Sequence, residues 1–188
     1  SKSPRTPCGL RSLRELLPQV AGHTHVSPHV RRSQLQQGES VLSWSDIFVD
    51  AEHLDFQALL AMWPRTVSGR LQPIGASVFG DCFFLRPSGY VEKLDVWEGG
   101  VHKVAESFSE FQSLMNEQEW QEQNLLTEGV ALLKSRKLLR GPGQFYAFAP
   151  HPAFTGKISW DRVMPMDAPV WHSICSQILD ADSEVAER

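Results

Sequence analysis

The 188-residue chain is 41% hydrophobic and carries 10 Phe and 6 Trp, so it can bury a sizeable core, most simply as one domain. It contains no run of about 18 apolar residues, which excludes a transmembrane helix. Its net charge of −4 argues against the strongly basic class of nucleic-acid-binding proteins.

The net charge conceals an asymmetry between the two sides of Gly38. Residues 1–38 hold six Lys or Arg and one acid, Glu15, for a net charge of +5. The remaining residues hold 12 basic and 21 acidic side chains, for a net charge of −9. An acidic domain repels phosphate backbones and favours basic partners, so we expect no direct contact between this domain and nucleic acid. The basic segment is typical of a solvated tail, although it could touch nucleic acid alone.

The cysteines indicate a reducing compartment. Cys8, Cys82 and Cys175 are odd in number and far apart, which fits neither a disulfide framework nor a zinc site. The sequence shows no charged-then-apolar secretion signal. We therefore expect reduced thiols and a cytoplasmic location.

Residues 1–40 are predicted to be a basic, polar and flexible segment, and residues 41–188 a single folded domain. Within the segment, residues 10–17 have leucines at helical spacing. His23, His25 and His29 have the spacing of metal ligands, but nothing nearby supplies a fourth ligand or a rigid scaffold. We therefore expect no metal site and no cofactor.

The domain begins near Trp44, and a helix is predicted over residues 55–63, where Pro64 ends it. Three apolar runs of strand length follow at residues 81–86, 90–97 and 101–106. The sequences Pro-Ser-Gly and Glu-Gly-Gly separate them, and these residue types form tight turns. The three runs therefore predict an antiparallel meander.

The first strand of the meander is predicted to be central. Phe83 and Leu85 would lie on one of its faces and Cys82 and Phe84 on the other, so both faces are apolar. The next strand alternates apolar and charged residues and is expected to be half-buried.

Helical and strand signals alternate in the rest of the chain. Ser107 and Glu110 have the spacing of a capping box that opens a helix. A second helical stretch is predicted over residues 117–139, with a weak point at 127–129. Two strands are predicted at 144–148 and 156–160. A closing helix from about Asp167 would place four side chains on its inner stripe: Val170, Ile174, Cys175 and Ile178.

These elements predict an α+β fold, with an antiparallel sheet of about five or six strands and helices packed mostly on one face.

Local signatures of catalysis are weak. The chain has no Gly-x-Ser-x-Gly nucleophile elbow. Asp81, Asp95 and His102 together could hold a metal ion for hydrolysis, but each also fits a structural place at a strand or turn. Cys82 and Cys175 are expected to be inert core thiols. His172 is expected to be a surface or interface histidine.

A set of short motifs, in order and spacing, resembles a bacterial family: the C-terminal domain of immunity proteins that protect against type VI secretion DNase effectors. The match covers roughly residues 44–179. In broad outline the chain is also similar to the SUKH-type immunity superfamily. In the type VI family a further domain precedes the match, whereas about forty basic, polar residues do so here. The motifs are Pro73-Ile74-Gly75, Phe79-Gly80-Asp81-Cys82-Phe83-Phe84-Leu85, Gly89, Leu94-Asp95-Val96, Gly99, the helix start from Ser107 to Phe111, Gly143-Gln144-Phe145-Tyr146 and Gln177-Ile178.

The resemblance implies a non-enzymatic immunity protein that binds and neutralises a cognate toxin. Such a toxin would be basic if it were a nuclease, and an acidic domain suits its capture. Two alternatives stay open: a hydrolytic enzyme of unknown substrate, and a regulatory or scaffolding module.

The predicted partner-binding patch combines acidic groups with an aromatic anchor. It comprises Asp95, Trp97 and Glu98, extended by Glu106 and Glu110. The acidic stretch with Glu117, Glu119 and Glu122 is an equally charged candidate, and Trp120 and Trp160 are further aromatic candidates.

The basic segment should be dispensable for folding, because its apolar residues are confined to residues 10–17 and cannot offset the entropy of ordering. A chain that begins at Glu39 should keep its melting temperature within about 5 °C of the full chain in thermal unfolding. A larger drop would show that the segment packs on the domain.

Overall fold

The computed structural model describes residues 42–180. The chain divides after Glu39 into two units, and every described residue belongs to the second. The predictions for the basic segment, including its leucine stretch, Cys8 and the three histidines, lie outside the described residues. So do residues 181–188.

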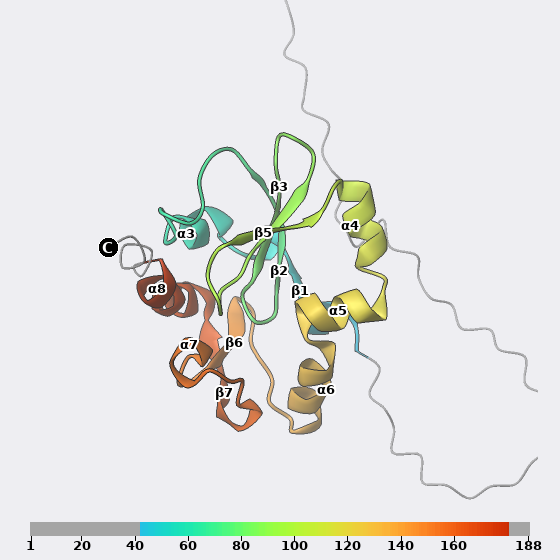
Figure 1. Cartoon of the computed structure of the whole chain (residues 1–188). Helices are drawn as coiled ribbons and strands as arrows, with labels where there is room; N and C mark the ends of the chain where they lie inside the picture. The colour runs from blue at the N-terminus through green and yellow to red at the C-terminus, as the bar shows by residue number, and fades with distance from the viewer. Residues whose placement is uncertain (1–41, 181–188) are drawn as a thin grey trace, which may run out of the picture. The chain divides into compact units, whose positions relative to one another are not determined.

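The domain is α+β and is built on a five-stranded antiparallel sheet whose strands follow one another in chain order (Figure 1). The three predicted strands are its β3, β4 and β5, while β1 and β2 carried no signal that was recognised. Gly75 in β2 lies against the Phe48 ring in β1, where a Cβ atom would collide with it. The strands are β1 Phe48–Asp50, β2 Gln72–Ser77, β3 Cys82–Leu85, β4 Val91–Leu94 and β5 Val101–Ala105.

A separate two-stranded antiparallel ribbon is formed by β6, Gln144–Phe148, and β7, Val163–Asp167. The bounds of β6 are those predicted from the sequence. The predicted strand at residues 156–160 is wrong, because residues 160–162 form a short 3-10 helix, η2, and the chain becomes extended only after it. β7 contains Pro165, which a strand in a two-stranded ribbon tolerates because its outer edge needs no N–H donor.

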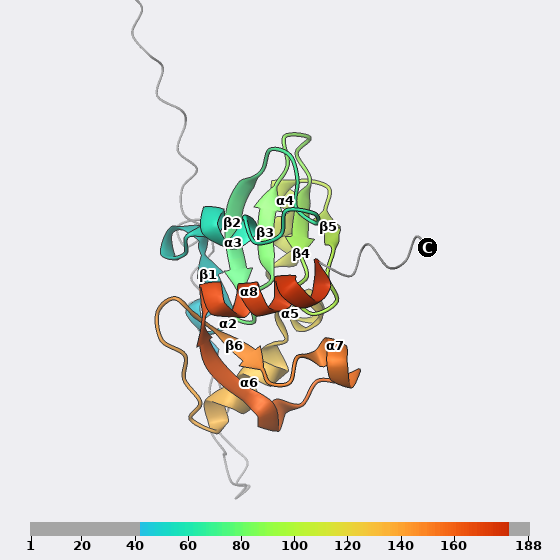
Figure 2. The ribbon, with the colours of Figure 1, turned by 90° about the vertical axis from the view of Figure 1, so that its left-hand side faces the viewer.

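The helices surround these two sheets. Figure 2 shows α8 between the five-stranded sheet and the ribbon. Among the described residues, no helix combines the length and apolar content needed to cross a membrane. The helices are α2 Trp44–Ile47, α3 Phe56–Leu60, α4 Phe108–Leu114, α5 Gln118–Leu125, α6 Thr127–Ser135, α7 Pro152–Thr155 and α8 Ala168–Leu179, with the 3-10 helices η1 Ala51–His53 and η2 Trp160–Arg162.

Helices cover both faces of the five-stranded sheet, so the prediction that they pack mostly on one face is wrong. On one face the Phe83 ring contacts Phe111 of α4 and Trp120 of α5, with ring centroids 5.6 and 6.0 Å apart. On the other face Cys82 lies beside His172 of α8, with Sγ 3.9 Å from Nε2. This arrangement agrees with β3 being apolar on both faces, as its sequence predicted.

Helix boundaries follow local chemistry. The Ser107 hydroxyl accepts a hydrogen bond from the Glu110 amide at 3.1 Å and caps α4, as predicted. The Glu110 carboxylate accepts from the Glu106 amide at 2.6 Å rather than from the cap residue itself. The predicted long helix over residues 117–139 is interrupted at Leu126, whose φ of 51° is left-handed, and so divides into α5 and α6.

The buried stripe of α8 differs from the predicted one. Cys175 is buried, but Val170 and Ile174 are 50% and 36% exposed. The stripe that faces the core is instead formed by Ala168, Trp171, His172, Cys175 and Ser176. The helix is rotated away from its most apolar face because the Trp171 and His172 side chains donate hydrogen bonds to buried carbonyls.

Phe84 lies in the core with no exposed surface. Phe84→Ala should lower the free energy of unfolding by about 3–5 kcal/mol, because it loses apolar burial and leaves a cavity. Urea unfolding measures this loss. Phe154→Ala is the control, since Phe154 is 71% exposed and should cost little. Equal stability of the two variants would contradict the placement of β3.

Candidate functional site

The turn between β2 and β3, residues 77–81, is buried where most turns face water. Phe79 at its tip is 1% exposed. Three successive carbonyls of this turn accept hydrogen bonds from distant elements. Val78 accepts from the Tyr146 amide of β6 at 2.8 Å, and Phe79 from the Trp171 indole of α8 at 2.8 Å. We call residues 77–81 the buried turn.

The third carbonyl, that of Gly80, accepts from His172 Nε2 at 3.0 Å. Because His172 Nδ1 accepts from the Trp63 indole at 3.1 Å, the proton of the neutral imidazole resides on Nε2. Burial lowers the pKa of His172 to about 4. The prediction of a surface or interface histidine is therefore wrong: both ring nitrogens are engaged in the core.

Asp81 closes the buried turn. Its carboxylate accepts from the Ser77 hydroxyl and from the Val96 amide, each at 3.1 Å. Burial raises the pKa of this carboxyl to about 6, although the Lys93 ammonium offsets part of the rise. The turn is thereby joined to the β4–β5 connection.

Cys82 and Cys175 lie in the core, as predicted from the sequence. Cys82 and Cys175 have no exposed surface, and burial raises the pKa of both. A neutral buried thiol is a poor nucleophile and a poor metal ligand.

The residues considered for metal-assisted hydrolysis do not form a cluster of metal-ligand atoms among residues 42–180. Asp81 is buried and hydrogen-bonded, whereas His102 is exposed on β5, opposite Lys93 in the sheet register. Asp95 lies in the β4–β5 connection, where Oδ1 accepts from the amides of Trp97 and Glu98 at 2.9 Å. Its Oδ2 lies 3.4 Å from Lys93 Nζ.

The predicted partner-binding patch is divided by the fold. Glu98 is exposed in the connection before β5, while Glu106 and Glu110 are exposed at the other end of that strand. At about 3.3 Å per residue, β5 alone separates the two groups by about 13 Å. Asp95 and Trp97 are half-buried rather than exposed. The five residues therefore form two separate surfaces.

Trp97 belongs to an aromatic cluster around the tip of the buried turn. Its ring centroid lies 5.5 Å from that of Phe79 and 5.0 Å from that of Phe148, both edge to face. Its indole N–H is buried without a hydrogen-bond partner in the described part of the chain. An open groove of about 420 Å³ lies beside it, lined by Glu98, Pro152, Ile158 and Leu179 among others.

Trp160 also packs in this cluster, with its ring centroid 5.9 Å from Phe79. Its ring rests on Gly129 of α6, where a Cβ atom would overlap it. The glycine that the sequence suggested as a weak point in the helix is thus the position at which a large aromatic ring meets the helix backbone. Trp120 is likewise core, with 8% exposure.

The acidic stretch folds as one helical layer. Between residues 104 and 133 the sequence has six Glu and no Lys or Arg. These residues run from the end of β5 through α4 and α5 to α6, and the three helices lie on one side of the sheet (Figure 1). We call the exposed carboxylates of this layer the acidic helical face; they are Glu106, Glu110, Glu117, Glu119 and Glu128.

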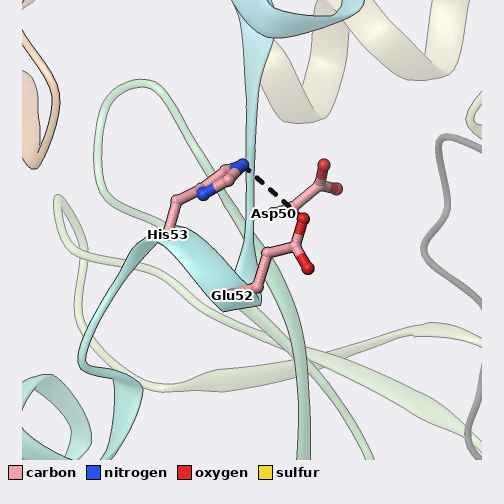
Figure 3. Close-up of side chains that lie close together, drawn as sticks. All are labelled: Asp50, Glu52 and His53. Carbon is pink, nitrogen blue, oxygen red and sulfur yellow. Dashed lines mark ion pairs between the residues drawn. The ribbon is translucent and has the colours of Figure 1, made fainter.

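One group of side chains has the composition of a metal site. Asp50, Glu52 and His53, at the end of β1 and in η1, bring one ligand atom each to within 4.8 Å of one another (Figure 3). Glu52 and His53 are more than half exposed, and their Oε1 and Nε2 atoms are 3.7 Å apart. These three groups could hold a divalent cation. Exposed carboxylates beside a histidine are also common without one, so we assign no metal here.

No protein-family model matches the chain, and no curated protein matches it. Among solved structures, the fold is similar to that of Atu4351 from Agrobacterium tumefaciens, with a TM-score of 0.47 and 16% sequence identity. The similarity covers 64% of this chain and 62% of Atu4351, less than two thirds of that protein's length.

Sequence reasoning missed the role of the buried turn and of its partners in α8. The available signal was the run Phe79-Gly80-Asp81, a large apolar residue within a turn sequence, which is unusual for a turn that faces water. Gly80 has a φ of 107°, and a Cβ atom there would lie 3.0 Å from the Trp171 ring. A glycine is therefore required both by the backbone and by the packing.

The buried acid and the buried histidine should have opposite effects on stability as pH falls. His172 has a lowered pKa, so its contribution is present above pH 6.5 and is lost as pH falls towards 4. Asp81 has a raised pKa, so its contribution is present below pH 3.8 and is lost as pH rises through about 6. Between pH 7 and pH 4 the two effects largely cancel in the wild-type protein.

Asp81→Asn should remove one side of this balance. We compare the free energy of unfolding of the wild type with that of Asp81→Asn. The difference, wild type minus variant, should become more positive by about 2 kcal/mol from pH 7 to pH 4. Urea unfolding at pH 7, 5 and 4 measures the difference, in which the other titrating groups cancel. A difference that does not change with pH would contradict the burial of Asp81.

Proposed function

We propose that this domain is an immunity protein, a binding protein that neutralises a basic cognate toxin by covering its active surface. The observation that carries the proposal is the acidic helical face. It presents five exposed carboxylates, of which Glu106 pairs with Lys103 at 2.6 Å, and the stretch from residue 104 to residue 133 contains no Lys or Arg. The motif resemblance to type VI immunity domains supplies the biological role.

The charge of the whole described domain supports capture of a basic partner. Residues 42–180 hold 17 Asp or Glu and 11 Lys or Arg. A nuclease toxin needs a basic surface to hold its phosphate substrate, so an acidic competitor both attracts it from a distance and occupies the substrate surface. On the inward side of the same helices, Phe111 and Trp120 pack on Phe83 of β3 and so fix the face to the sheet.

The alternative of a hydrolytic enzyme has less support from the geometry. The buried titratable groups already have structural partners: Asp81 bonds Ser77 and Val96, and His172 bonds Trp63 and Gly80. A general acid or base must reach the proton that it transfers, and these groups face the core. Reproducible metal-dependent turnover that is lost in Asp81→Asn would reverse this preference.

The test expresses each reading frame adjacent to this gene in the source genome and asks whether its product is toxic to cells. Co-expression of the wild-type protein should restore the growth of cells that produce this toxin. Glu117→Lys combined with Glu119→Lys should slow association at least tenfold at low salt, abolish most of its salt dependence and weaken protection. Folding should be unchanged, because both side chains are exposed.

The matched control combines Glu52→Lys with Glu98→Lys, which changes the net charge equally at exposed positions outside the acidic helical face. This variant should associate and protect nearly as well as wild type. If instead the control lost binding and the Glu117 and Glu119 variant kept it, the contact surface would lie elsewhere. Absence of protection by the wild-type protein would reject the immunity role.

A further inference from the structure

Arg140 is held in a fixed position between two elements. It lies between α6 and β6 in the sequence, and its side chain is half-buried. Nη1 donates to the Gln144 carbonyl at 3.3 Å, and Nη2 donates to the Ser45 carbonyl of α2 at 3.0 Å. These two bonds use two of the five N–H donors of a guanidinium. The group is therefore oriented while much of its donor capacity remains.

Among residues 42–180, Arg140 forms no direct ion pair that would neutralise its charge. Within residues 42–180, neighbouring cations have carboxylates: Lys134 Nζ lies 2.7 Å from Asp46, and Arg136 Nη1 lies 2.9 Å from Asp161. No carboxylate in this part of the chain lies within ion-pair distance of Arg140. The side chain is half-buried, and this burial lowers the pKa of its guanidinium.

A pocket of about 270 Å³ opens beside this guanidinium, and we call it the Arg140 pocket. Lys134 and Asp46 contribute its other charges, so the net charge of the lining is positive. Its apolar walls come from Val130, Leu139 and Tyr146. The volume lies just below the usual range for small-molecule sites, about 300–1,000 Å³, which restricts the ligand to a compact one.

We infer that the Arg140 pocket binds the carboxylate of a small molecule with a short apolar body. A guanidinium presents parallel N–H groups that match the two oxygens of a carboxylate, and a partly desolvated one binds it more strongly than water-exposed groups do. The Asp46 carboxylate at the same pocket disfavours ligands with two negative charges. A monocarboxylate therefore fits better than a phosphate monoester, and the apolar walls favour an aromatic or branched body.

The test titrates the full-length protein with benzoate, benzamide and phenylphosphonate. Binding is measured from the amide chemical shifts in NMR spectra at each ligand concentration. Benzoate should bind with a Kd of about 1 mM or below. Benzamide, which is neutral and nearly the same size, should bind at least tenfold more weakly, and phenylphosphonate should also bind more weakly than benzoate. The shifts should be concentrated at Leu139, Gly141 and Tyr146. Equal binding of benzoate and benzamide, or no saturation by benzoate at 10 mM, a concentration about tenfold above the expected Kd, would overturn the inference.

Two substitutions locate the site. Arg140→Gln should weaken benzoate binding at least tenfold, whereas Arg136→Gln, the same change at the C-cap of α6 and outside the pocket, should leave it unchanged. Because Arg140→Gln also removes bonds between α2 and β6, Leu139→Glu gives a second measurement at a side chain that is 71% exposed. It places a negative charge at the pocket mouth and should weaken benzoate at least fivefold without weakening benzamide. Equal losses in Arg136→Gln and Arg140→Gln, or no loss in Leu139→Glu, would refute the assignment.

Discussion

The domain depends on satisfying the backbone of a turn that is buried. A carbonyl removed from water without a donor costs of the order of 1–3 kcal/mol, and the buried turn carries three in succession. β6 supplies one donor through its backbone, and the Trp171 and His172 side chains supply the other two. The hydrogen bonds of the turn between β2 and β3 are thus completed by β6 and α8, which lie in the last third of the chain. This requirement also fixes His172 as a neutral donor, so its lowered pKa accompanies a structural role.

Features governed by neighbouring residues could be predicted from the sequence. The meander followed from its turn residues, the start of α4 from the Ser107 cap, and the double burial of β3 from its alternation. Long-range hydrogen bonds could not be read in the same way. The face of α8 was assigned by apolar content, which favours Val170 and Ile174, whereas the actual orientation is set by a carbonyl 92 residues away from His172. Strand propensity at Ile158 and Trp160 was likewise overridden, because the Trp160 ring packs on Gly129.

For surfaces, counting charges was more informative than turn geometry. The acidic stretch after β5 was evident from the sequence, and it remains exposed in the fold. The patch centred on Asp95 and Trp97 was not exposed as expected, because Asp95 caps its own turn and the Trp97 indole joins the aromatic cluster. The Arg140 pocket had no sequence signal, since it exists only where α2 meets the chain near Arg140, 95 residues later.

The separation between the buried turn and α8 has a consequence for biosynthesis. During translation the turn leaves the ribosome before its partners, and at about 5–20 residues per second the intervening 92 residues take about 5–18 s to make. Over that interval the Phe79 and Gly80 carbonyls have water as their partner, and the Phe79 ring gains its contacts with Tyr146, Phe148 and Trp160 only as β6 and η2 are made. The side-chain donors for the Phe79 and Gly80 carbonyls are supplied only when α8 has been made.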